Sequence, residues 1–206
     1  MNKETLDIEA LKKDPEFLEN LKRLEKEMLE EHSIAKGYQV LDAKLVIAAS
    51  EDEINEIFTF IVNTAFDRLS SYLTEPRKFD MTDPEDFATA RAIYEHGIQR
   101  YSENDQKGAK EIFLVLYHMF TLEALKEGMM VHACAVMSGT EFEVFIEEFA
   151  DVSEADPEDP MAFFITTFVQ PTDMLLAMWG NYVQQGKEEL KVLEENDAPV
   201  DSDSKG

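Results

Sequence analysis

Apolar residues recur at intervals of three and four along most of this chain, which is the spacing of one face of an α-helix. The clearest case is the stretch 93–116, where two apolar stripes flank a polar patch around Asn104. Because Asn tolerates a left-handed backbone, we predict a helical hairpin that turns at Asn104. The stripes comprise Ile93, Tyr94, Gly97, Ile98 and Tyr101, then Ala109, Ile112, Phe113 and Leu116.

This hairpin resembles one tetratricopeptide repeat, a helix-turn-helix unit of about 34 residues. The resemblance rests on Gly97, Tyr101, Asn104, Ala109 and Phe113, which fall without a gap. More narrowly, Ile-Tyr, then Tyr101, then Ala-Lys-Glu-Ile-Phe is similar to the first repeat of the class II chaperones of bacterial type III secretion, which escort translocator proteins. The alternative interpretation is an amphipathic helical hairpin of another kind.

The N-terminal part also has helical patterns. Asp14-Pro15 is typical of a cap followed by a first-turn proline, so a helix is expected from Pro15 to about Ala35, with Gly37 ending it. Its narrow apolar seam requires a partner helix, either within the same chain or in a second copy, which would make a homodimer. The seam consists of Phe17, Leu21, Leu24 and Met28.

Three further signals precede the hairpin. Residues 38–49 fit a helix or a strand, and we predict a helix. Residues 50–53, Ser-Glu-Asp-Glu, form a capping box that begins a helix whose apolar stripe continues to the stop at Pro76. Asp83-Pro84 then caps the first helix of the hairpin.

Beyond the hairpin, the repeat pattern weakens. A helix change is expected between Phe120 and Glu123, and the next helix should end at Ser138-Gly139. Residues 140–143, Thr-Glu-Phe-Glu, predict a second capping box and a second hairpin that turns at Gly139.

The last part of the chain predicts a helix over 161–169, a third turn at Gly186 and a short helix over 187–194. We therefore expect an all-α protein with a tetratricopeptide-like array of helical hairpins at 83–196. A helical region at 1–82 precedes the array, and a disordered acidic tail at 197–206 follows it.

Charge and targeting signals limit the partners. With 44 acidic and 19 basic residues, the net charge of −25 opposes nucleic acid and anionic membranes. The apolar run 161–169 is too short to span a bilayer, so membrane insertion is not expected. The lone Cys134 forms no internal disulfide, and the N-terminus lacks a signal-peptide core, so we expect a cytoplasmic protein.

Catalytic and metal-binding patterns are missing from the sequence. No histidine has a glutamate three residues before it, as a di-metal helical bundle requires. His132 and Cys134 are two apart on an expected helix and point to different sides, so they do not pair as base and nucleophile. No phosphate-binding glycine loop or dinucleotide fingerprint occurs. We therefore expect no enzyme activity, no metal and no cofactor.

Methionine is concentrated in the C-terminal half, and no Lys or Arg occurs from Met129 to Gly186. Two interpretations stay open: core filling, or a flexible apolar surface rimmed by carboxylates that accepts different partners. The methionines are Met119, Met129, Met130, Met137, Met161, Met174 and Met178.

The resemblance implies a chaperone or adaptor that holds a hydrophobic partner, such as a type III secretion translocator, in the bacterial cytoplasm. The first helix of each repeat lines the concave groove in that family. This implies the partner-binding residues Tyr94, Ile98, Tyr101, Met129, Ala133, Val136 and Met137. The alternative from a different class is a helical enzyme or a bundle that binds a small ligand among the same Met and Phe residues.

Overall fold

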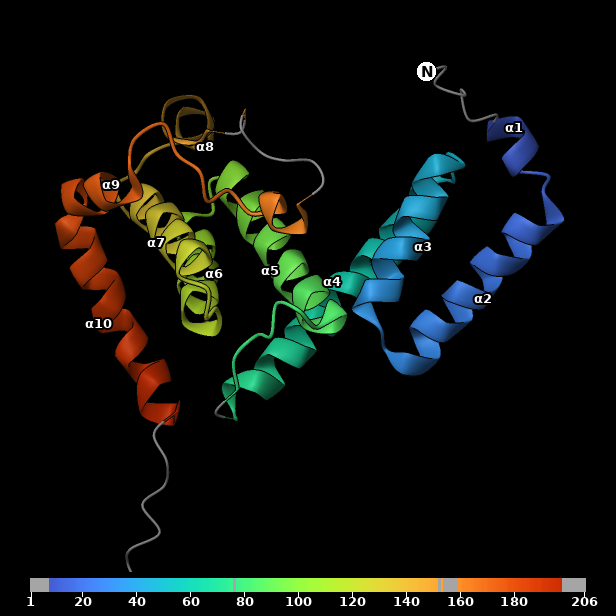
Figure 1. The fold of residues 1–206 in the computed structure, drawn as a ribbon, viewed down its shortest axis with the longest axis horizontal. Coiled ribbons are helices and arrows are strands. Elements are labelled where there is room, and N and C mark those ends of the chain that lie inside the picture. The colour runs from blue at the N-terminus through green and yellow to red at the C-terminus, as the bar shows by residue number, and fades with distance from the viewer. Residues whose placement is uncertain (1–7, 76, 152, 154–158, 198–206) are drawn as a thin grey trace, which may run out of the picture.

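The computed structural model describes residues 8–75, 77–151, 153 and 159–197, and these form an all-α architecture, as predicted (Figure 1). Within these residues the only β-type pairing is an isolated antiparallel bridge between Ala150 and Phe168. The helices are α1 (Ile8–Leu11), α2 (Pro15–Glu31), α3 (Ile34–Val46), α4 (Glu51–Leu73), α5 (Pro84–Ser102), α6 (Gln106–Met119), α7 (Glu123–Met137), α8 (Phe142–Val144), the π-helical η1 (Phe145–Phe149), the 3₁₀ turn η2 (Pro160–Phe163), α9 (Thr172–Met178) and α10 (Gly180–Asp197).

Helix α5 lies between two groups of helices. On one side α3 and α4 pack against it, with α2 lying outside α3. On the other side α6 packs against α5, α7 against α6, and α10 against both α6 and α7 (Figure 1). One buried cluster runs through both groups, from Leu21 in α2 to Leu190 in α10.

The predicted hairpin is confirmed as α5 and α6, which turn at Asn104 with a left-handed φ of 61°. The helices approach closely because small residues lie at their crossing. A methyl group at Gly97 would lie only 2.8 Å from Ile112 Cγ2, and Ala109 is fully buried. Small side chains at these positions are therefore a packing requirement.

The helix starts read from the sequence are also confirmed. Asp14 and Asp83 each accept bonds from the backbone N–H groups two and three residues ahead. Ser50 and Glu53 form both bonds of a capping box. Each cap satisfies N–H donors that the first helical turn leaves unpaired.

The predicted end of the first long helix is wrong. Helix α2 stops at Glu31 because His32 takes a left-handed φ of 50° and Ser33 caps α3. Gly37 lies inside α3, where a methyl group would come within 2.8 Å of Ile61 Cγ1. The glycine allows α3 to approach α4 and does not terminate a helix.

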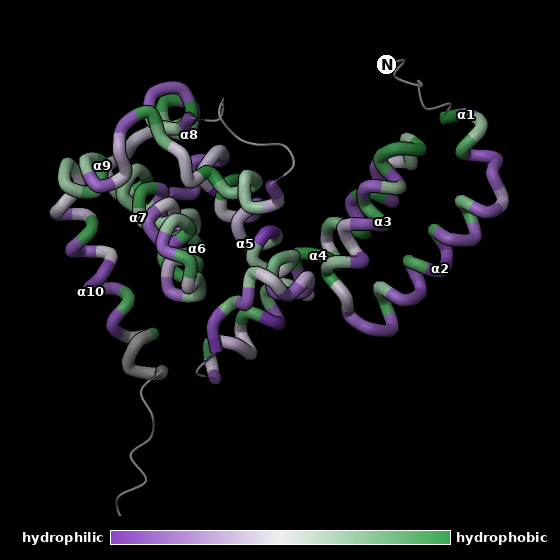
Figure 2. The backbone as a smooth tube through the Cα atoms, viewed as in Figure 1, coloured by the Kyte–Doolittle hydropathy of each residue, from purple (hydrophilic) through white to green (hydrophobic). Residues whose placement is uncertain are grey.

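The apolar seam of α2 packs against α3 of the same chain. Leu21 and Met28 are buried, and Phe17 and Leu24 are partly buried against the core. Figure 2 shows the apolar positions of α2 spaced among hydrophilic ones. The helix expected over 38–49 is confirmed for residues 38–46, the larger part of α3, whereas 47–49 lie beyond the helix end, with a left-handed φ of 48° at Ala48. The homodimer is not tested by one chain and stays a prediction.

The C-terminal boundaries are confirmed in part. Helix α6 ends at Met119, α7 begins at Glu123, and Gly139 forms a left-handed turn after α7 with a φ of 78°. The second capping box is wrong, because Glu141 occupies the cap position without a side-chain bond. The hydroxyl of Thr140 pairs with that of Ser138 instead. The helix that follows is short and continues as the π-helical turn η1.

Two further predictions are corrected. Residues 161–169 are not a helix: after η2 the chain is extended, with Thr167 O and Val169 N–H bonded to residues 151 and 149. Gly186 is not a turn but lies within α10, where a methyl group would meet Leu114 Cδ2 at 3.0 Å. The tail expected at 197–206 lies outside the described residues, apart from Asp197, which ends α10.

Candidate functional site

One face of α5 lines two adjoining hollows, which we call the α5 groove. The first has a volume of about 380 Å³ and lies between α3, α5 and η2. The second, of about 260 Å³, lies beside it further along α5. The walls are mostly apolar. They include Tyr38, Met81, Phe87, Arg91 and Met161 in the first hollow, and Tyr94, Glu95, Ile98, Phe163 and Ile165 in the second.

A stacked cation separates the two hollows. The guanidinium of Arg91 lies 4.0 Å from the ring centroid of Tyr38 and 4.6 Å from that of Phe163. Its Nε also donates to Glu95 Oε1 at 3.1 Å. Arg91 is therefore held by two aromatic rings and one carboxylate.

Glu95 has a second donor, the hydroxyl of Tyr38, at 2.5 Å. Burial, and then the charge of Glu95, raise the pKa of Tyr38, so this hydroxyl keeps its proton. The contacts of Glu95 connect α3 to α5, and the Arg91–Phe163 stack connects α5 to η2. The ridge between the hollows is thus fixed by three elements far apart in the sequence.

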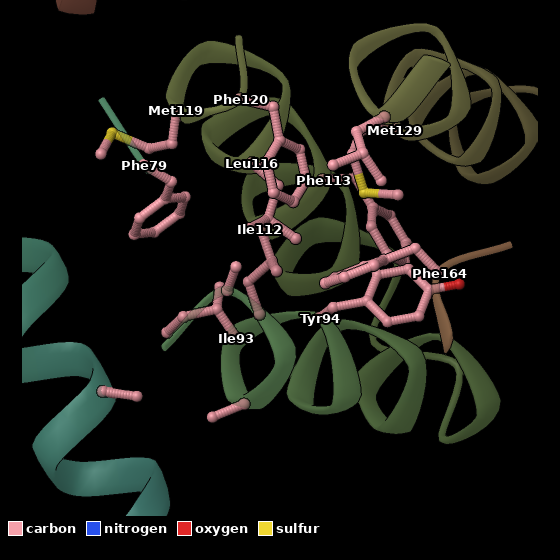
Figure 3. Packing of buried hydrophobic residues seen from close by; sticks show 14 of the residues in the cluster. Phe79, Ile93, Tyr94, Ile112, Phe113, Leu116, Met119, Phe120, Met129 and Phe164 are labelled. Carbon is pink, nitrogen blue, oxygen red and sulfur yellow. The ribbon is translucent and has the colours of Figure 1, made fainter. Parts of the chain in front are cut away.

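The extended segment 164–169, which we call the strap, follows η2 (Figure 1). It contributes Ile165 to the wall of the second hollow. Phe164 is 1% exposed and packs against four aromatic rings, those of Phe87, Tyr94, Phe120 and Phe163, at centroid distances of 5.2 to 6.0 Å. Figure 3 shows Tyr94 and Phe164 side by side in this packing. The strap is anchored by aromatic contact.

A buried chain of hydrogen bonds also holds the strap. The backbone N–H of Ile165 donates to Tyr94 Oη at 3.1 Å. Tyr94 Oη lies 3.1 Å from His132 Nε2, and His132 Nδ1 lies 2.7 Å from Gly128 O. Burial lowers the pKa of His132 to about 4 and raises that of Tyr94. A neutral imidazole then accepts from Tyr94 and donates to the carbonyl oxygen of Gly128.

Gly128 of α7 makes room for the strap. A methyl group there would lie 3.0 Å from Thr166 Cγ2 and 3.2 Å from the carbonyl oxygen of Ile165. The strap therefore crosses directly over the backbone of α7. The helix face that would line an open groove in a repeat array is covered here by the chain itself.

The residues implied by the resemblance fall mostly in the core. Tyr94, Tyr101, Met129, Ala133 and Val136 are buried, and Ile98 and Met137 are half-buried. Tyr101 donates its hydroxyl to Thr140 O at 2.8 Å, with its ring against Phe142 and Phe145. Of the seven, only Tyr94 and Ile98 line the α5 groove.

The sequence interpretation missed Tyr38, Phe87, Arg91, Glu95 and Phe163. A signal was present for three of these, because Phe87, Arg91 and Glu95 lie on one face of α5 with Tyr94 and Ile98 at steps of three and four. Tyr38 and Phe163 join them only through tertiary packing, which periodicity does not report.

The methionines divide between the two interpretations. Met119, Met129 and Met130 are buried and fill the core, whereas Met174 and Met178 are more than half exposed. Met137 and Met161 are intermediate, and Met161 lines the first hollow.

Comparison with known protein families, curated proteins and solved structures finds no match for this chain. Its chemistry is therefore read from the geometry alone. In the described part of the chain, no group of three His, Cys, Asp or Glu side chains could hold a metal ion. None of the described helices is both long and apolar enough to cross a bilayer. Cys134 is buried, and burial raises the pKa of its thiol to about 12.

Proposed function

We propose that this protein is a binding protein, a chaperone or adaptor that receives an apolar segment of a partner protein in the α5 groove. The observation that carries the proposal is the groove itself, two adjoining apolar hollows with a fixed ridge between them. Concave, mostly apolar surfaces with a few placed polar groups are the usual form of binding sites.

The residues of the ridge are better suited to binding a peptide than to catalysis. Arg91, Glu95 and Tyr38 are bonded to one another. Asp83, which also lines the first hollow, accepts the first backbone N–H groups of α5, so these charged groups already have partners. Phe163 is 37% exposed on the ridge and offers an aromatic contact between them. Alternate side chains of a partner segment would occupy the hollows, and such pockets give specificity.

The resemblance of residues 93–116 to the class II chaperones suggests the partner: a hydrophobic translocator of type III secretion, held in the bacterial cytoplasm. The experiment is co-expression with hydrophobic proteins encoded beside its gene, followed by purification of the complex. Phe163→Ser and Ile98→Ser should each reduce the retained partner by about tenfold, since aromatic and apolar anchors dominate interfaces.

Leu122→Ser is the matched control, because Leu122 is an exposed apolar residue outside the groove. It should retain the partner as the wild type does. If none of these proteins co-purifies, or if the control loses a partner as fully as the groove variants do, the proposed function is wrong. A small molecule found in the hollows after purification would instead favour a ligand-binding bundle.

A further inference from the structure

The short helix α9 has two apolar faces, and only one is buried. Leu175 and Trp179, four residues apart, point into the core and are almost fully covered. Met174 and Met178, also four apart, are 58% and 56% exposed. A helix on a protein surface normally turns polar residues outward. Figure 2 shows α9 mostly in the hydrophobic colour.

Another exposed apolar side chain lies near α9, because Val169 is bonded to Phe149, whose ring packs on Trp179. Val169, at the end of the strap, is 61% exposed, the most exposed large apolar side chain in the described part of the chain. We call Val169, Met174 and Met178 the α9 face. Exposed apolar residues gathered on one part of a surface mark interaction sites, and flexible methionines adapt to different partner surfaces.

Three carboxylates lie near the α9 face. Asp173 lies beside Met174 on the helix. Val169 N–H donates to Phe149 O at 2.9 Å, and the ring of Phe149 packs on Trp179 at 5.1 Å, which brings the end of η1 next to α9. Glu147 and Glu148 on η1 are exposed.

None of these three carboxylates forms an ion pair with a described Lys or Arg. The sequence has no basic residue from Met129 to Gly186. The surroundings of the α9 face are therefore strongly negative, and a partner that covers it gains from positive charge.

We propose that the α9 face is a docking surface for a basic amphipathic helix of a partner protein. The apolar stripe of that helix packs on Met174, Met178 and Val169, and its lysines or arginines approach Glu147, Glu148 and Asp173. This surface is separate from the α5 groove, and its use does not depend on the function proposed for the groove.

The test uses two synthetic amphipathic peptides of about 18 residues, long enough for five helical turns. One contains Leu and Lys and the other Leu and Glu in the same positions, and binding to the full chain is followed by fluorescence anisotropy. The Lys peptide should bind at least about tenfold more tightly than the Glu peptide, and its affinity should fall with added salt.

Two sets of variants locate the site. Met174→Ser with Met178→Ser should weaken the Lys peptide by about tenfold or more, since both side chains are anchors of the contact. The control is Leu29→Ser with Leu45→Ser, two equally exposed apolar residues in α2 and α3. Circular dichroism verifies that each variant keeps its helix content.

The second set tests the charges. Glu147→Gln, Glu148→Gln and Asp173→Asn together should weaken binding and flatten its salt dependence. The matched control, Glu19→Gln, Glu56→Gln and Asp67→Asn, makes the same changes at exposed carboxylates elsewhere. If the control trio has the same effect, or if the methionine pair has none, the attraction comes from the net charge alone and the proposal is overturned. Phe163→Ser should leave this binding unchanged.

Discussion

Tyr94 of α5 and His132 of α7 share a buried hydrogen bond of 3.1 Å, and through it the strap is linked to two helices at once. Tyr94→Phe removes this bond and also leaves the Ile165 N–H without its acceptor. We expect the free energy of unfolding to fall by about 1–3 kcal/mol, because buried groups without partners lose their solvation. Urea unfolding measures the change.

Tyr117→Phe is the control for this substitution, since its hydroxyl has no hydrogen-bond partner among the described residues. It should change stability by less than about 0.5 kcal/mol. Equal effects of the two substitutions would show that the Tyr94 hydroxyl does not hold the strap.

Because His132 is buried in its neutral form, we expect the folded protein to lose stability in acid. Its pKa falls from 6.5 to about 4 on folding because burial disfavours the charged ring. Between these values the unfolded chain binds a proton that the folded chain does not, so stability is complete above about pH 6.5 and is lost as the pH falls toward 4. The loss from this residue should reach about 3 kcal/mol.

Many carboxylates titrate in the same range, so the measurement compares wild type with His132→Gln. The variant should start less stable at neutral pH and lose less on acidification. Parallel curves of unfolding free energy against pH would contradict the assignment of this loss to His132.

The close packing of α5 and α6 requires a small side chain at Ala109. Ala109→Leu should lower the free energy of unfolding by about 1–3 kcal/mol, because the added atoms force the two helices apart. Thermal unfolding checks it against Lys107→Leu, a position on the same helix with a side chain that is 84% exposed. A midpoint unchanged by Ala109→Leu would mean that this crossing tolerates a larger side chain.

Replacement by alanine should change the free energy of unfolding in opposite directions at Gly37 and Gly180. Gly37→Ala places a methyl group 2.8 Å from Ile61 Cγ1 and should destabilise by about 1–3 kcal/mol. Gly180→Ala meets no atom within 4 Å at the start of α10 and should stabilise slightly, by less than about 1 kcal/mol. Urea unfolding of both variants tests whether close approach, rather than backbone freedom, explains Gly37.

These glycines also show where sequence interpretation succeeds and fails. Helix starts at Asp14, Ser50 and Asp83 were predictable because a cap is a local contact, made within a few residues. Gly37 was wrongly predicted to end a helix and Gly186 to form a turn, because the role of these glycines is to admit Ile61 and Leu114, which are distant in sequence. A local pattern does not distinguish these two uses of glycine.

The site was predictable in the same limited way. That Tyr94 and Ile98 share one face of α5 was predictable, since it follows from helical periodicity, and this face lines a hollow. The strap was not predictable from the sequence, because its apolar run fits a helix as well as an extended segment. What decides it is the contact of Ile165 with Tyr94 and of Thr166 with Gly128, and both depend on the tertiary fold.

Cys134 allows the transient exposure of α7 to solvent to be measured without any substitution. It is the only cysteine, it is fully buried, and its thiol pKa is raised to about 12. A thiol-specific reagent needs the thiolate and direct access, so it reacts only when α7 opens to solvent. The rate of thiol modification therefore reports how often α7 opens to solvent. A partner that binds the closed form should slow it, whichever surface the partner occupies.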